Sequence, residues 1–114
     1  MAEATGRGAA APEVREVLDE IRTLIPGREI REVAMFGAVA VMVDDAMAVA
    51  VHKDRTLLVR VAADEDDRML DEPDARRAVM GRDRDMGAGW LHIDLDPERS
   101  RLGHWVEAAL RRPR

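Results

Sequence analysis

Hydrophobic and polar residues alternate with two different periods along this chain of 114 residues. Over residues 12–24 the apolar side chains recur at the spacing that places them on one face of an α-helix. Pro12 suits the first turn of a helix, and the Pro26-Gly27 pair ends one. We therefore predict a helix from about Pro12 to Leu24, preceded by a flexible lead-in at residues 1–11. Its apolar face consists of Val14, Val17, Leu18, Ile21, Leu24 and Ile25.

Residues 35–51, MFGAVAVMVDDAMAVAV, are almost all small or apolar, in a chain whose residues are 36% charged. A membrane-spanning helix would need about 20 apolar residues, and Asp44 and Asp45 interrupt this run near its middle. The β-branched residues on both sides of the two aspartates instead predict a β-hairpin. The alternation in REIREVAM (28–35) predicts a strand before the hairpin, and residues 56–62 predict another after it.

The loop length of the hairpin decides which side chains share a face, because a shift of one residue moves a whole strand to the other face. A two-residue turn at Asp44 and Asp45 would pair Val41 with Ala48 and mix large and small residues on both faces. A three-residue loop, 44–46, separates them, and we predict this loop. Bulky residues then form one face: Val39, Val41, Val43, Met47, Val49, Val51, Leu57, Val59 and Val61. The opposite face, here called the alanine face, consists of Ala40, Met42, Ala48, Ala50, Leu58, Arg60 and Ala62.

The alanine face is apolar apart from Arg60, whereas strand positions that face water more often carry Thr, Lys or Glu. We expect the bulky face to pack against the first helix and to build the core. Two explanations for the alanine face remain open: the C-terminal helix lies across it, or another protein or a second copy of the chain binds there. The candidate interaction surface consists of Ala40, Met42, Ala48, Ala50 and Arg60.

The second half of the chain predicts two more helices and one strand. ADEDDRML (63–70) is a short helix with acidic residues in its first turn, and residues 76–89 are typical of a loop. GWLHIDLD (89–96) alternates like a strand, and Asp96 and Pro97 mark the start of a closing helix as its N-cap and first residue. The order α-β-β-β-β-α-β-α predicts an α+β fold, a mostly antiparallel sheet with flanking helices, in a single domain at residues 12–112.

Candidate catalytic and metal-binding groups are few. The chain has no cysteine, which excludes disulfides, thiolate metal sites and a cysteine nucleophile. His92, Asp94 and Asp96 could line one face of a strand, but Asp96 is assigned to the helix cap, so we expect an edge strand and no metal. The few Ser and Thr residues lie in no nucleophile motif, and no glycine-rich segment fits a phosphate-binding loop. We expect no catalytic residues, no cofactor and no enzymatic activity.

The charge distribution argues against nucleic acid as the main partner. The net charge is −5, whereas phosphate binding is led by positive potential. The C-terminal end is nevertheless basic, with Arg99, Arg101, Arg111, Arg112 and Arg114. Because no signal-peptide pattern opens the chain, we expect a cytoplasmic protein.

Short motifs follow one another in a specific order: Met35-Phe36-Gly37-Ala38, Gly81-Arg82, Met86 to Trp90, and Trp105-Val106 with Ala109. Over about Pro12 to Leu110 this order resembles the TfoX N-terminal domain family, although Ala38 stands where the family has a second glycine. The resemblance implies an α+β fold similar to that of the type III secretion chaperones, and a small regulatory or protein-binding domain. It also implies structural roles for Met35, Phe36, Gly37, Gly81, Arg82, Gly89, Trp90 and Trp105.

Two functions remain open. The first is a non-enzymatic regulatory or protein-interaction module of the TfoX N-terminal domain type, which binds a protein partner or forms a homodimer. The second is an accessory transcriptional regulator, like the family's competence regulators, that contacts DNA through its arginine-rich C-terminal helix. The net charge favours the first function, so we expect neither specific nucleic-acid binding nor a membrane partner.

Overall fold

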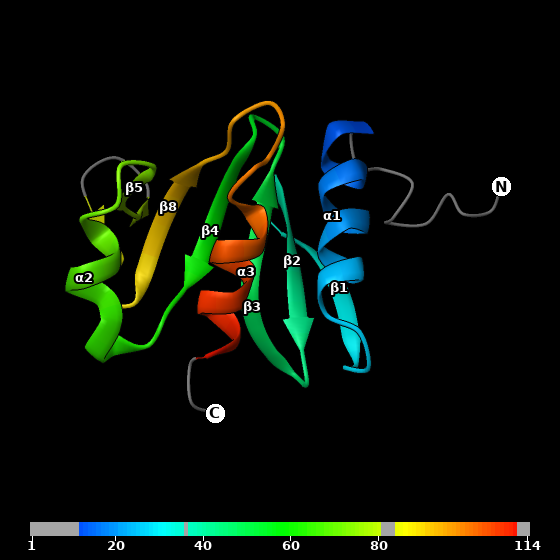
Figure 1. Ribbon diagram of the computed structural model, residues 1–114, viewed down its shortest axis with the longest axis horizontal. Coiled ribbons are helices and arrows are strands. Elements are labelled where there is room, and N and C mark those ends of the chain that lie inside the picture. Colours follow the sequence, from blue (N-terminus) through cyan, green and yellow to red (C-terminus); the bar gives the residue numbers. More distant parts are fainter. Residues whose placement is uncertain (1–11, 36, 81–83, 112–114) are drawn as a thin grey trace, which may run out of the picture.

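A six-stranded antiparallel sheet with helices packed on one face forms the body of the protein (Figure 1). The computed structural model describes residues 12–35, 37–80 and 84–111. The strand order is β1-β2-β3-β4-β8-β5, and β6 and β7 form a separate two-stranded sheet. The elements are α1 (Pro12–Leu24), β1 (Ile30–Met35), β2 (Ala38–Val43), β3 (Ala46–His52), β4 (Thr56–Arg60), η3 (Ala63–Glu65), α2 (Asp66–Leu70), β5 (Ala75–Arg77), β6 (Val79–Met80), β7 (Arg84–Asp85), β8 (Trp90–Asp94) and α3 (Leu102–Leu110).

The predicted first helix is confirmed as α1, and its apolar face is buried except for Leu24, which is 40% exposed. α1 and α3 lie on the same side of the sheet (Figure 1), where they close the main core together with Met69 of α2. Trp105, Leu18 and Ile21 are among the largest side chains that are fully buried there. None of the helices in the described ranges is long and apolar enough to cross a membrane.

The predicted α+β class and the order of its elements are confirmed. The structure adds short strands in the segment that the sequence indicated as a loop. Among these, β5 pairs with β8, with Arg76 opposite His92, so the prediction that β8 is an edge strand is wrong. The three residues of β5, Ala-Arg-Arg, are too few to show an alternating pattern. They form a strand because they pair with β8, and this pairing cannot be predicted from their sequence. The lead-in at residues 1–11 lies outside the described residues and stays a prediction.

The hairpin between β2 and β3 turns through two residues, so the predicted three-residue loop is wrong. Asp44 and Asp45 have positive φ angles of 51° and 70°, as a type I′ turn requires. This turn matches the right-handed twist of the two strands, and that match outweighs the sorting of large and small side chains that favours a longer loop.

A β-bulge corrects the register a few residues beyond this turn. Met42 pairs with Met47, but Val41 pairs with Val49, so Ala48 is the extra residue. The bulge turns Ala48 into the main core, while Met47 packs on the opposite face. The prediction that Ala48 lies on the alanine face is therefore wrong, although the predicted face is correct for Ala40 and Ala50.

The C-terminal helix differs from its prediction in position and in starting point. α3 packs on the bulky face, with Trp105 0% exposed, so the alternative in which it lies across the alanine face is wrong. It begins at Leu102 rather than near Pro97. Asp96 accepts hydrogen bonds from the N–H and hydroxyl of Ser100, and Arg99 has a φ of 55°, which separates this turn from the helix.

Candidate functional site

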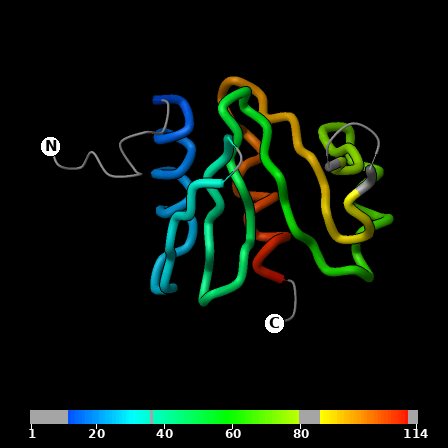
Figure 2. Tube along the Cα trace, turned by 180° about the vertical axis from the view of Figure 1, so that it is seen from behind, coloured from blue at the N-terminus to red at the C-terminus, as the bar shows by residue number. Residues whose placement is uncertain are grey.

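The face of the sheet opposite α1 and α3, here called the open face, is covered by no helix of the described chain (Figure 2). The pairing register places one row of side chains straight across it. The row is apolar on β1 to β4 and polar on β8 and β5. Its members are Val33, Ala40, Ala50, Leu58, His92 and Arg76.

Small residues form the floor of the apolar half of the open face. Ala38, Ala40 and Ala50 are only 7%, 0% and 2% exposed. Because an alanine side chain ends at Cβ, longer side chains on the neighbouring strands can close over it. These covering side chains, each partly buried, are Val33, Met42, Met47 and Leu58. A partner on this face would therefore contact the covering side chains rather than the alanines.

Arg60 and Trp90 are paired across β4 and β8 at one end of the open face. Cζ of Arg60 lies 4.8 Å from the centre of the Trp90 ring, which is a cation–π contact. Within the described ranges, no carboxylate forms an ion pair with Arg60. The arginines on the outer strands of the same face differ, because Arg31 of β1 pairs with Asp45 and Arg76 of β5 pairs with Asp94.

His92 and an ion pair occupy the polar half of the open face, and His52, at the end of β3, lies beside them. The rings of His52 and His92 are stacked with their centroids 6.5 Å apart. Arg76 donates through Nε and Nη2 to the two oxygens of Asp94, at 3.0 and 2.9 Å. Burial, followed by the nearby Arg76 guanidinium, lowers the pKa of His92, so this imidazole is neutral at pH 7.

The three residues considered as metal ligands do not converge. His92 and Asp94 share the open face, as their spacing predicts, but both oxygens of Asp94 accept hydrogen bonds from Arg76. Asp96 belongs to the turn before α3, where it binds Ser100. No three His, Cys, Asp or Glu side chains of the described residues form a group that could hold a metal ion.

The open face brings together four of the five residues of the predicted interaction surface: Ala40, Met42, Ala50 and Arg60. Val33 was not predicted for this surface, because the register places it beside Ala40 only once β1 is known to pair with β2. The predicted face of Met47 is wrong, because nothing in the sequence of β3 marks the bulge.

The first family motif connects β1 to β2. Met35 ends β1 and is 38% exposed, and Ala38 begins β2. Gly37 has a φ of 79°, in the region that favours glycine, whereas the φ of Ala38 is not positive. The motif therefore needs glycine at its third position, and alanine is accommodated at the fourth. Phe36, Gly81 and Arg82 lie outside the described residues.

Gly89 occupies a position that only glycine fills without strain. Its φ is 91°, and a Cβ there would lie 3.1 Å from the carbonyl oxygen of Val61. Its N–H donates to Oδ1 of Asp66 at 2.7 Å. This close approach sets the start of β8 and so places Trp90 on the open face.

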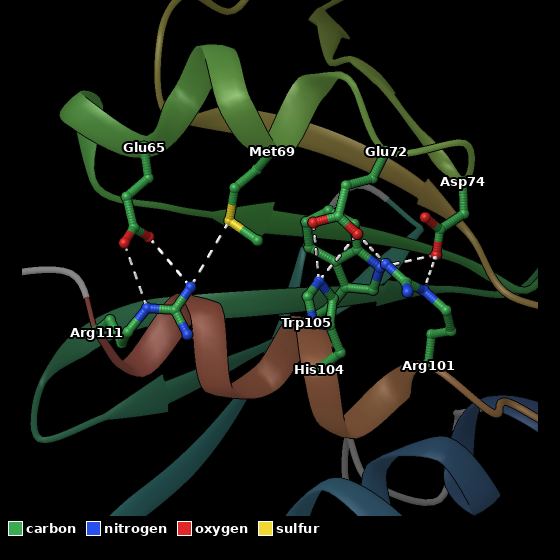
Figure 3. A network of polar contacts seen from close by, with 8 residues as sticks. All are labelled: Glu65, Met69, Glu72, Asp74, Arg101, His104, Trp105 and Arg111. Carbon is green, nitrogen blue, oxygen red and sulfur yellow. Dashed lines mark hydrogen bonds and ion pairs between the residues drawn. The ribbon is translucent and has the colours of Figure 1, made fainter.

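Polar side chains join α3 to the segment that follows α2 (Figure 3). Trp105 donates its indole N–H to Oδ2 of Asp74 at 2.8 Å, and Nε of Arg101 donates to the same oxygen at 3.2 Å. Arg101 also binds Glu72, and Nε2 of His104 lies 3.1 Å from that carboxylate. The family-motif residue Trp105 is thus a core residue with a polar anchor.

The arginines of the C-terminal region are likewise engaged within the fold. Nη2 of Arg111 lies 3.2 Å from the Glu65 carboxylate, and Nε of Arg99 donates to Glu20 at 2.8 Å. With Arg101 bound to two carboxylates, each of these cations is opposed by an acidic side chain. Arg112 and Arg114 lie outside the described residues.

Comparison with known families identifies the chain. The family model of the TfoX N-terminal domain matches residues 23–112. The chain belongs to this family. The match covers every strand of the sheet and α3, so the open face is part of the TfoX N-terminal domain itself. No curated protein and no solved structure gives a significant match.

Proposed function

We propose that this TfoX N-terminal domain is a non-enzymatic regulatory module that binds another protein on its open face. The observation that carries the proposal is that the sheet is apolar on both faces over β1 to β4, while the helices of the described residues cover only one face. An antiparallel sheet with one solvated face normally alternates apolar and polar residues along its strands. β2 and β3 depart from that rule, since their open side carries alanine and methionine.

The side chains that cover the alanines suit a binding surface. Methionine is flexible and polarizable, so Met42 and Met47 can adapt to the shape of a partner. Val33 and Leu58 add branched apolar side chains on the two flanking strands. Contiguous apolar surface with a polar rim is typical of protein-interaction sites, and the rim here includes Arg60 and His52.

The contacts of the C-terminal arginines weigh against the alternative of a DNA-binding regulator. Binding to phosphates requires cations that are free to replace counterions. Arg99, Arg101 and Arg111 each oppose a carboxylate of the same chain. Exchanging these contacts for phosphates would break links between α3 and the rest of the fold, so we favour a protein partner.

Site-specific crosslinking in the native host tests this proposal. A photo-crosslinking amino acid replaces Met42 on the open face or, as the matched control, the exposed Glu107 of α3. We expect a crosslinked product of one defined mass from position 42 and none of that mass from position 107. Leu58→Glu should abolish the product, because it adds a charge to the apolar surface, whereas Leu24→Glu, at a residue 40% exposed on α1, should not.

The mass of the product separates the two binding alternatives. A mass of twice the chain would show a homodimer, and we expect a different mass. Equal products from both positions, or a product that persists in Leu58→Glu, would contradict binding on the open face. Circular dichroism of each variant checks that it is folded.

A further inference from the structure

Arg60 is a cation on the open face, and its contacts differ from those of Arg31 and Arg76 on the same face. Its guanidinium lies over the Trp90 ring, and within the described part of the chain it opposes no carboxylate. Arg31 and Arg76 both oppose aspartates. Stacking on an aromatic ring uses the face of the guanidinium and leaves the N–H groups at its edge available as donors.

The guanidinium of Arg60 lies next to the apolar half of the open face. Leu58 precedes it by two residues on β4, so the two side chains lie on the same face about 7 Å apart along the strand. Leu58 packs against the floor of alanines. A segment that covers Leu58 and the two methionines therefore reaches Arg60 within about two residues of extended chain.

We propose that the partner bound on the open face is an apolar protein segment whose Asp or Glu carboxylate binds Arg60. This inference rests on the proposed function and specifies the chemistry of the partner. A carboxylate matches the fork of a guanidinium in a bidentate geometry, and the Trp90 ring holds that fork in place before binding.

A second copy of the chain fits this site less well. Two carboxylates beside the polar half of the open face already accept hydrogen bonds within the chain, Asp94 from Arg76 and Asp54 from Thr56. A second copy would also bring its own Arg60 and Arg76 toward the same surface. Charge complementarity therefore selects a different, acidic partner.

The experiment selects displayed random peptides against the full chain, in parallel with Arg60→Glu. We expect peptides selected by the wild type to share an acidic residue at a fixed distance from apolar ones. Those selected by Arg60→Glu should carry Lys or Arg at that position. Arg68→Glu, the same charge change at an exposed residue of α2, is the matched control and should select the wild-type consensus.

Fluorescence quenching then measures one selected peptide and its Glu→Gln or Asp→Asn counterpart. The chain has two tryptophans and no tyrosine, and Trp105 is 0% exposed, so acrylamide quenches mainly Trp90. The acidic peptide should shield Trp90, and its neutral counterpart should bind about tenfold more weakly. Arg60→Gln should weaken the acidic peptide similarly and leave the affinity of the neutral one unchanged.

The outcomes separate this inference from the proposed function. Suppose that the selected peptides lose binding in Leu58→Glu but share no acidic residue, and that they bind Arg60→Glu as well as the wild type. This result would overturn the proposal that a carboxylate binds Arg60, while binding on the open face would still hold. Peptides that bind Leu58→Glu unchanged, or the absence of any binder, would overturn both. Unfolding curves of Arg60→Glu and Arg60→Gln establish that these variants are folded.

Discussion

Arg77 binds the buried carboxylate of Asp66 with both of its terminal nitrogens, at 2.8 and 2.7 Å. The two side chains are 23% and 6% exposed, so water competes little for the pair. Asp66 also accepts the N–H of Gly89 at 2.7 Å. One carboxylate thus joins α2 to β5 and to the start of β8, next to the Trp90 of the proposed binding surface.

Asp66→Ala should lower the free energy of unfolding by about 3 kcal/mol, because it removes the buried carboxylate to which both Arg77 and the N–H of Gly89 donate. Asp94→Ala is the control, since it removes a similar bidentate pair in which Arg76 and Asp94 are 57% and 53% exposed. It should cost less than about 1 kcal/mol. Urea unfolding measures both variants, and equal costs would contradict a special role for Asp66.

Gly89→Ala should destabilise the fold more than Gly37→Ala. Both glycines have positive φ, 91° and 79°, so each substitution carries a backbone cost of about 1 kcal/mol. Only at Gly89 does the new Cβ meet another atom, the carbonyl oxygen of Val61 at 3.1 Å, while nothing lies within 4 Å of it at Gly37. The difference between the unfolding free energies of the two variants measures the cost of the contact between the new Cβ and the carbonyl oxygen of Val61. A difference near zero would show that the backbone around residue 89 relaxes and removes this contact.

Elements with a regular period could be predicted from the sequence, and those set by local geometry could not. The spacing of apolar residues predicted α1, because a helix that packs on a sheet needs one continuous apolar face, and Pro12 and Pro26-Gly27 marked its ends. The alternation along β2 likewise placed Ala40 on the open face. The bulge at Ala48 leaves no such signal, because either an alanine or a methionine fits on either face.

The contacts of the candidate site depend on pairs that are distant in sequence. Trp105 is hydrogen-bonded to Asp74, and Arg60 lies over Trp90, but no local pattern connects these residues. The start of α3 could not be predicted from the sequence either, since Asp96 and Pro97 have the sequence of a helix cap and first turn, but the helix begins at Leu102. The positive φ of Arg99 ends that turn before the helix begins, and this conformation cannot be read from residue types.

Asp45→Gly should stabilise the protein by about 0.5 kcal/mol. Asp45 is the second residue of a type I′ turn, with a φ of 70°, where glycine is favoured because it has no Cβ. Little is lost, because its side chain is 85% exposed and lies 3.8 Å from Arg31. Asp44→Gly, the control, relieves a φ of 51° but removes the 2.7 Å contact with Arg28, so its gain should be smaller. Thermal unfolding ranks the two variants, and a lower melting temperature for Asp45→Gly would contradict the turn geometry.

Glu32 should make the stability of the protein depend on pH between about 4.5 and 2. Arg15 donates to both of its oxygens at 2.9 and 2.6 Å, and Arg22 donates to one at 3.0 Å. Hydrogen bonds from Arg15 above all lower the pKa of Glu32 from 4.5 to about 2. Because the folded value lies below the unfolded one, the unfolded chain binds more protons in this interval. The contribution of Glu32 is therefore present above pH 4.5 and is lost as the pH falls toward 2.

Comparison with Glu32→Gln isolates this contribution, because the other carboxylates titrate in both proteins and cancel in the difference. At pH 7 the wild type should be more stable by about 2 kcal/mol, less than the full pKa shift would give, since Arg15 and Arg22 are 26% and 41% exposed. At pH 2 the difference should shrink to less than half, as measured by urea unfolding at each pH. Glu13→Gln, at an exposed position of α1, is the control and should change the unfolding free energy at pH 7 by less than about 0.5 kcal/mol. A difference for Glu32→Gln that stays constant from pH 7 to pH 2 would show that packing, rather than charge, accounts for the role of Glu32.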